Sequence, residues 1–360
     1  MKRVSILILA LVALCGCSKK ENSISAGDGT ELGFALAGVS TEVLLSGQAS
    51  VSSKGDVRDV VRAGTDLVGE NLEAGVTVRV LAYQRRDGGV AADIEQDLFV
   101  EEATYQVQDD GSLKACTVNA SGEVTATTGP AMRLRAGVYD FYALTPALPL
   151  IEYKRVSVAH GTDYACSLTA GCGITVQEPT VVQTVELSVL ERRCSQINFS
   201  ITRKAENVAE AVIESAELSG IGRSPAEAVL CQPLPTGTND GTYVFPPSIF
   251  KQEAEPYRYS GTDEVLPKSN AAYDLAMKVV FNGADEASAL QATIPAMAFD
   301  PGKRYNFNVS LQGDFIVLSL QITPWNTDAV WDAPDVGEPP YATFVVETWE
   351  ISEWTTDVAS

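Results

Sequence analysis

The side chains that most often carry catalysis are sparse in this chain. His160 is the single histidine among 360 residues, and it lies in the turn-like segment Ala159-His160-Gly161-Thr162-Asp163, where we expect an exposed loop. A Ser-His-Asp site would have to use this one imidazole as its base. The G-x-S-x-G, H-E-x-x-H, Walker and G-x-G-x-x-G motifs do not occur in the sequence. We therefore predict no catalytic residues, no enzymatic activity and no cofactor.

Paired carboxylates can serve glycoside hydrolysis, and the chain contains several, including Glu101-Glu102 and Asp109-Asp110. Neighbouring side chains on a strand point to opposite faces, so we interpret these pairs as solvated charge. A glycosidase pair is defined by a distance in the fold, so that alternative stays open. Metal ligands are not indicated, because there is no C-x-x-C pair and His160 has no partner at ligand spacing. We predict no metal site.

The cysteines could form disulfides if the chain is exported from the cytoplasm. Two of the seven lie in the first twenty residues, and an odd count of five leaves at least one thiol unpaired in the monomer. Cys166 and Cys172 are the closest pair, and whether they bridge a short loop stays open. The five later cysteines are Cys116, Cys166, Cys172, Cys194 and Cys231.

The first twenty residues have the character of an export signal. Lys2-Arg3 precedes an apolar run, Val4–Leu14, which is too short to span a bilayer as a stable helix. The run ends in Leu14-Cys15-Gly16-Cys17, which resembles the lipobox of bacterial lipoproteins. That resemblance implies a signal peptide over residues 1–16, lipid on Cys17, and a mature protein anchored to the outer membrane at the cell surface. An ordinary signal peptide is the alternative.

The composition limits the kinds of partner that the protein can bind. With 26 basic and 47 acidic residues, the formal net charge is −21. Such a surface repels nucleic acid, and no Lys/Arg-rich run offsets the repulsion. It also disfavours electrostatic docking on anionic lipid. A hydrophobic content of 45% is enough for packed cores, and the length suits two domains.

Apolar residues alternate with polar ones at a period of two along most of the chain, which is typical of strands with one face in a core. Glycine-marked turns such as Asn282-Gly283 separate these runs. Ala205–Leu218 is the one segment that tempts a helical assignment, and its alternating residues favour a strand. We predict an all-β protein of antiparallel sandwiches. Clear alternating sets are Val76/Val78/Val80, Tyr139/Phe141, Ile197/Phe199/Ile201 and Tyr305/Phe307/Val309/Leu311.

Two β-sandwich domains in tandem are expected, over residues 76–190 and 191–325. The boundary is placed near Glu191-Arg192-Arg193, a charged stretch before the strand Ile197–Thr202. Residues 17–75 precede the first domain and residues 326–360 follow the second. Prolines at positions 334, 339 and 340 favour an extended linker that keeps the last strand, Tyr341–Trp354, away from its own domain.

Three regions, in this order after the lipobox, together resemble the fimbrillin families of Bacteroidetes-type bacteria. They are Arg135–Leu144, Cys194–Ile201, and Gly302–Val309 followed by Leu320–Trp325. The resemblance implies Greek-key, transthyretin-like sandwiches in a subunit of a surface fimbria. The implied partners are other fimbrial subunits, with a ligand on a host or bacterial surface as a further partner.

The resemblance also implies a mode of assembly. In such families a protease removes an N-terminal segment, which opens a groove in the first domain. The C-terminal strand of a neighbouring subunit then fills that groove by strand addition. A missing strand leaves unpaired backbone groups and an open core, which an incoming alternating strand satisfies together. Repeated head-to-tail contacts of this kind build a filament.

Candidate processing sites are Arg58 and Arg62, which precede the first clear strand at Val76. Cleavage there would remove Glu31–Val43, the removable strand segment of residues 17–75. Either arginine alone could instead be an ordinary basic residue in a solvated loop. The N-terminal strand could also be retained, with Phe34, Leu36 and Val39 in the fold and strand-like spacing only as far as Leu36.

The candidate donor strand is Tyr341–Trp354, which is partly apolar on both faces. The alternative is a final strand packed on its own domain. Stalk, tip and anchor roles stay open, as does a surface glycan-binding or adhesive lipoprotein that does not polymerise. Phe344 and Val346 lie on one face of the expected strand, and Val345, Trp349 and Ile351 on the other.

Overall fold

The computed structural model describes residues 29–41, 68–86, 91–176, 181–203, 211–237, 240–253, 258–311, 316–324 and 344–346. Within these ranges the chain forms β-strands and one short 3₁₀ helix, η1 (Pro247–Ile249), with no α-helix. The predicted all-β class is confirmed. The ambiguous segment is also a strand where it is described, because β16 begins at Ala211 and runs to Gly222.

The first half is built around a seven-stranded antiparallel sheet in the order β14-β12-β9-β4-β5-β6-β7. Its central strands are apolar on both faces, because both faces are covered. In β4, Val78 and Val80 enter one core, whereas Leu81 and Tyr83 enter another. The strands are β4 (Thr77–Gln84), β5 (Leu98–Val107), β6 (Leu113–Val118), β7 (Val124–Ala126), β9 (Gly137–Thr145), β12 (Ala165–Ile174) and β14 (Glu191–Arg192).

Smaller sheets cover the two faces of this sheet. On one face lies the sheet β13-β1-β8, which contributes Leu32, Phe34 and Val185 to the first core. On the other face lies β10-β11-β17, which contributes Val156 and Ala228 to the second core. The strands are β1 (Thr30–Leu36), β8 (Arg133–Leu134), β13 (Gln183–Leu187), β10 (Leu150–Ile151), β11 (Arg155–Val158) and β17 (Ala226–Val229), with β2 (Val39–Thr41) and β3 (Val68–Glu70) forming a separate pair.

The second half is a sandwich of a six-stranded sheet, β19-β20-β15-β23-β24-β25, and a four-stranded sheet, β18-β16-β21-β22. Both sheets share one core, in which Phe199 makes edge-to-face contacts with Phe245 and Phe307. The strands not yet bounded are β15 (Ser195–Arg203), β18 (Asp240–Phe245), β19 (Lys251–Gln252), β20 (Arg258–Val265), β21 (Lys268–Phe281), β22 (Ser288–Phe299), β23 (Lys303–Leu311), β24 (Ile316–Pro324) and β25 (Phe344–Val346).

The strand pairing is antiparallel, as expected, except at two places. β1 pairs in parallel with β13, and β15 pairs in parallel with β23. Alternation along a single strand does not reveal the direction of its partner, so the sequence could not show these two pairs. β1 thus runs in the same direction as β13 along residues 32–36.

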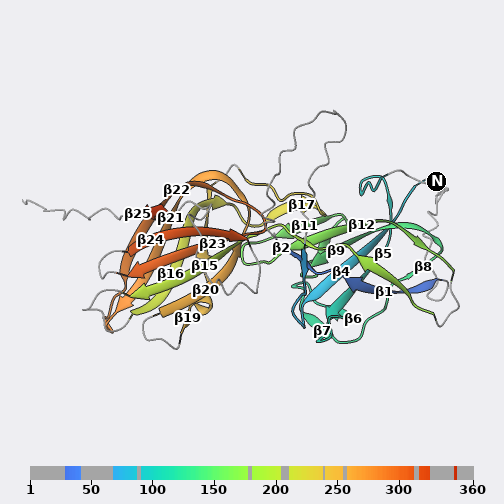
Figure 1. The fold of residues 1–360 in the computed structure, drawn as a ribbon, viewed down its shortest axis with the longest axis horizontal. Coiled ribbons are helices and arrows are strands. Elements are labelled where there is room, and N and C mark those ends of the chain that lie inside the picture. The colour runs from blue at the N-terminus through green and yellow to red at the C-terminus, as the bar shows by residue number, and fades with distance from the viewer. Residues whose placement is uncertain are drawn as a thin grey trace, which may run out of the picture.

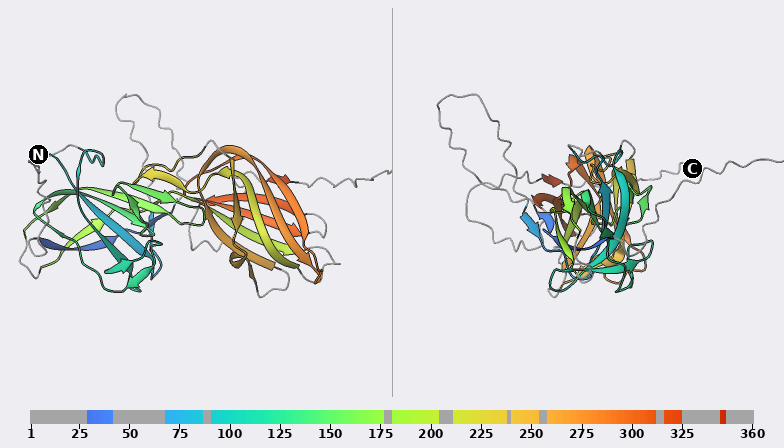
Figure 2. Two further views of the ribbon diagram at one scale, coloured as in Figure 1. Left: turned by 180° about the vertical axis from the view of Figure 1, so that it is seen from behind. Right: turned by 90° about the vertical axis from the view of Figure 1, so that its right-hand side faces the viewer.

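The two halves lie end to end along the longest axis of the molecule (Figure 1). β17 belongs to the second half by sequence but pairs antiparallel with β11 of the first half, from Arg155↔Val229 to Val158↔Ala226. In the left-hand view of Figure 2 the two bodies meet over a short junction, with the yellow strand β17 beside it. The alternating pattern of the sequence indicated the strands, but it did not indicate that β17 pairs with a strand of the other half.

No helix in the described ranges is long and apolar enough to cross a membrane. The same part of the chain holds no group of three or more His, Cys, Asp or Glu side chains arranged to bind a metal ion.

Candidate functional site

The N-terminal strand β1 occupies the middle of a three-stranded sheet. It pairs in parallel with β13 from Leu32↔Gln183 to Leu36↔Leu187, and its first two residues pair antiparallel with β8. The Leu32 amide also donates a hydrogen bond to the Met132 carbonyl at 2.9 Å. β1 is therefore paired with β8 at its start and with β13 along the rest of its length, so its loss would leave unpaired donors and acceptors on both neighbours.

The inward side chains of β1 fill the first core. Leu32 is 2% exposed and Phe34 is 6% exposed. The Phe34 ring stands edge-on to Tyr105 and Phe141, with centroid distances of 5.3 and 5.5 Å. Burial of each of these two side chains contributes about 1.5–3 kcal/mol. β1 is therefore part of the hydrophobic core and not a surface addition.

Polar contacts hold the beginning of β1 more weakly. Glu31 pairs with Arg133 at 2.7 Å, but both side chains are about one-third exposed, so the pair adds little stability. The Thr30 hydroxyl donates to the Thr175 carbonyl at 2.8 Å. Most of the affinity of the groove for β1 therefore comes from the core residues and the backbone ladder.

The structure agrees with the expected N-terminal strand. Phe34 and Val39 lie in the core, Leu36 is half-buried, and β1 ends at Leu36, where the strand-like spacing ended. The sequence reading missed Leu32, although the alternation Leu32-x-Phe34-x-Leu36 carries the signal.

The candidate lipidation and processing residues, Cys17, Arg58 and Arg62, lie outside the described residues. Their place in the chain still bears on β1. Both arginines lie between β2, which ends at Thr41, and β3, which begins at Val68. A cut at either one would leave β1 and β2 without a covalent connection to the rest of the protein.

Part of the candidate donor strand is described, and it pairs with its own domain. β25 lies antiparallel to β24 through Phe344↔Leu320, Val345↔Ser319 and Val346↔Leu318. This is the alternative placement considered above, and it differs from the expected extended linker. Three of the nine residues of β24 are paired with β25, which is the outermost strand of the sheet. The other two candidates, Trp349 and Ile351, lie outside the described ranges.

His160 was expected in an exposed loop, and this prediction was wrong. The residue is 8% exposed, because its loop is inserted between the two halves. Its Nδ1 accepts from the Leu266 amide, its Nε2 donates to the Gly222 carbonyl, both at 3.0 Å, and its own amide donates to the Ser224 hydroxyl. Burial lowers the pKa of His160 and keeps the ring neutral. It therefore acts as a structural link.

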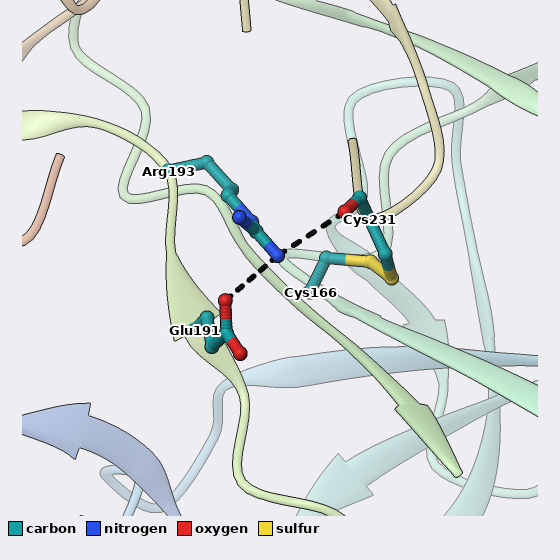
Figure 3. The surroundings of a disulfide bond; sticks show 4 residues. All are labelled: Cys166, Glu191, Arg193 and Cys231. Atoms are coloured by element: carbon teal, nitrogen blue, oxygen red, sulfur yellow. Dashed lines mark hydrogen bonds and ion pairs between the residues drawn. A yellow bond between two sulfur atoms is a disulfide. The ribbon is translucent and has the colours of Figure 1, made fainter. Parts of the chain in front are cut away.

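The disulfide joins Cys166 to Cys231, so the pairing considered with Cys172 is wrong (Figure 3). Cys166 lies in the second core, whereas Cys172 packs against the first core on the opposite face of the sheet. Beside the bond, Arg193 donates to the Cys231 carbonyl at 3.2 Å and pairs with Glu191 at 2.9 Å. Cys116, Cys172 and Cys194 are free thiols. The disulfide connects the two halves of the molecule.

The paired carboxylates have structural partners. Glu101 accepts a hydrogen bond from the Arg133 amide, whereas Glu102 pairs with Arg79 at 3.2 Å. In the other pair, Asp110 accepts from the Ser112 amide within its turn. The two neighbours on the strand engage different partners, as expected for side chains on opposite faces.

A cavity of about 800 Å³ lies beside the disulfide. Its walls include Tyr142, Arg193 and Gln232, together with residues 91–97. The wall carries charged side chains beside apolar ones such as Ile94 and Leu230, so the cavity suits a ligand with both polar and apolar parts.

Comparison with known proteins bears on the family. A model of the family described as fimbrillin-like matches residues 37–329. A candidate cell adhesion protein from Bacteroides fragilis NCTC 9343 has a similar structure, with a TM-score of 0.63 and 20% identity over 84% of this chain and 100% of that chain. The search of curated proteins found no match.

Two further solved structures have lower scores. A candidate cell adhesion protein from Bacteroides ovatus ATCC 8483 gives a TM-score of 0.48 and 11% identity over 84% of this chain and 100% of that chain. The tip fimbrial protein Mfa3 from Porphyromonas gingivalis, with a C-terminal truncation, gives a TM-score of 0.41 and 10% identity over 70% of this chain and 95% of that chain. At 20% identity, the likeness to the Bacteroides fragilis protein concerns the fold alone. Because the family match extends over most of the sequence, this chain belongs to the fimbrillin-like family.

Proposed function

We propose that the protein is a structural or accessory subunit of a cell-surface fimbria, exported as a lipoprotein on Cys17 and assembled by donor-strand exchange. The observation that carries the proposal is the position of β1. A strand from the N-terminal end of the chain fills a central place in the first domain, and the candidate processing residues Arg58 and Arg62 follow it in sequence. Family membership supports a role in fimbriae.

Loss of β1 would turn a closed sheet into an acceptor groove. β13 would lose its five paired positions with β1, and the pocket between Tyr105 and Phe141 would lose the Phe34 ring. Exposed apolar surface and unpaired backbone both favour the addition of a new strand. The groove thus supplies affinity through its backbone and specificity through its pockets.

The tail is the proposed donor. β25 is held to β24 by three antiparallel residue pairs at an outer edge, which is a weaker attachment than the five parallel and two antiparallel pairs of β1. The exchange of this edge for the longer pairing and the buried side-chain sites in the groove of a neighbour favours assembly. The donor and the groove lie in different halves, so the contact is head-to-tail and extends into a filament.

We expect cleavage by an Arg-specific protease at Arg58 or Arg62 to convert the monomer into filaments. N-terminal sequencing of the product would identify the cut, and negative-stain electron microscopy would show the assembly. The double variant R58A/R62A provides the matched control, and it should stay monomeric under the same treatment.

Deletion of residues 339–360 should abolish assembly of the cleaved protein while leaving its fold intact by circular dichroism. Filaments that form unchanged would rule out the tail as donor. A cleaved full-length protein that stays monomeric would contradict polymerisation. It would favour the second candidate, a non-polymerising adhesive lipoprotein, which the cavity of mixed polarity beside the disulfide supports.

A further inference from the structure

We propose a specific register for the donor strand. In the filament, Phe344 of one subunit takes the place of Phe34 in the groove of the next, with Ala342 in the place of Leu32 and Val346 in the place of Leu36. The inference rests on the strand exchange proposed above and adds the residues that determine its specificity.

The groove accepts side chains at every second position. In β1, Thr30, Leu32 and Phe34 are buried and Leu36 is half-buried, whereas Ala35 is exposed. The Phe34 site is the most demanding of these, because its walls are Tyr105 and Phe141, which are 2% and 0% exposed. A smaller side chain would leave a void between the two rings, and a larger one would force them apart. An incoming strand therefore needs an aromatic residue with an apolar residue two positions before it and two after it.

One window of the tail meets this requirement. Residues 339–360 contain four aromatic side chains. Tyr341 has a proline two positions before it, Trp349 has Glu347 there, and Trp354 has a serine. Phe344 is the aromatic residue in this tail with apolar neighbours on the same face at both sides, Ala342 and Val346. A shift of one residue in one direction would bring Glu347 to the half-buried Leu36 place, and a shift in the other would bring Thr343 to the buried Phe34 place, so the register is specified.

The outward positions of the groove tolerate the same register. Thr343 takes the place of Gly33, where an added Cβ would meet a side-chain carbon of Val182 at 3.3 Å. Val182 is 49% exposed and can move by the small amount required. The donor is expected to run in the direction of β1, because β13 receives a parallel strand over five residue pairs.

The residue that faces Ala35 from strand β13 allows a direct test of the register. Ala35 lies opposite Glu186 in the β1–β13 pairing, and both side chains are exposed. In the proposed register Val345 takes the place of Ala35. Cysteines at positions 186 and 345 would then face each other across the subunit boundary, within reach of a disulfide.

The experiment uses the full chain cleaved at Arg58 or Arg62, in a C172S background that removes the partly exposed free thiol. Three double variants, E186C/V345C, E186C/E347C and E186C/T343C, are assembled and oxidised, and the products are separated without reductant. The first should give a ladder of covalent multimers, and the other two should remain largely monomeric. Covalent multimers from E186C/E347C would show a register that is shifted by two residues. Covalent multimers from E186C/T343C would show a shift in the opposite direction or a donor strand that runs in the reverse direction. Either result in place of the E186C/V345C ladder overturns the proposal.

A pair of truncations keeps the test independent of cysteine chemistry. F344A should lower the yield of filaments at least about tenfold, because it empties the pocket between Tyr105 and Phe141. V345A shortens a side chain that takes the exposed place of Ala35 and should assemble as the parent does. Filaments that form without any covalent multimers, or that survive F344A but not V345A, overturn the register while strand exchange still holds. Failure of every variant and of the parent to polymerise overturns both proposals.

Discussion

His160 connects the two halves of the molecule through three hydrogen bonds. A protonated ring could not accept from the Leu266 amide, so the contact requires neutral imidazole. Burial lowers the pKa of His160 in the folded protein. Below its ordinary pKa the unfolded chain therefore binds a proton that the folded chain does not, and this contribution to stability is lost as the pH falls.

We expect H160Q to be less stable than the parent at about pH 8, and the difference to shrink as the pH falls toward about 5. Denaturant unfolding of both proteins across this range is the measurement. The difference between the two curves is the informative quantity, because Glu264 acts in the opposite direction. Burial, followed by the nearby charge of Asp163, raises the pKa of Glu264 to about 7. A constant difference at every pH would contradict the role of the neutral ring.

Strand β1 shows what its inward residues contribute before processing. In the uncleaved protein, F34A should lower the free energy of unfolding by about 3–5 kcal/mol, because it leaves a cavity between two buried rings. L36A, at a half-buried position of the same strand, is the matched control and should cost less. Denaturant titration of both variants would measure the losses. Similar small losses for both would contradict the central place of β1.

The strands were predictable because alternation is a local signal, and β1, β15 and β23 follow it closely. In β9, by contrast, both faces are buried from Tyr139 onward, because sheets cover both sides of it. The parallel partner of β1 and the crossing of β17 into the first half were not predictable. Both depend on contacts between residues far apart in sequence, which periodicity does not record. The N-terminal strand was predictable through the spacing of Phe34 and Leu36, whereas the buried place of His160 was missed, because a short turn-like segment gives no sign of what packs over it.

The disulfide is expected to stabilise the whole molecule, because it links residues of both halves. It closes a loop with a sequence separation of 65 residues between Cys166 and Cys231. A loop of that size predicts a loss of about 2–4 kcal/mol when the bond is removed. We expect C166S/C231S to show this loss in denaturant unfolding and C172S to show none. The same unfolding curve for the double variant and the parent would indicate that the bond adds no stability.

The β11–β17 pairing and the Cys166–Cys231 bond join the two halves, in addition to the backbone and the hydrogen bonds of His160. In a fibre, one half of each subunit would hold the preceding neighbour and the other half the following one. A pulling force would then be shared by the backbone link, the β11–β17 ladder and the sulfur bridge. Such a subunit would resist stretching as a stiff rod, and the fibre would yield first at the joints between subunits.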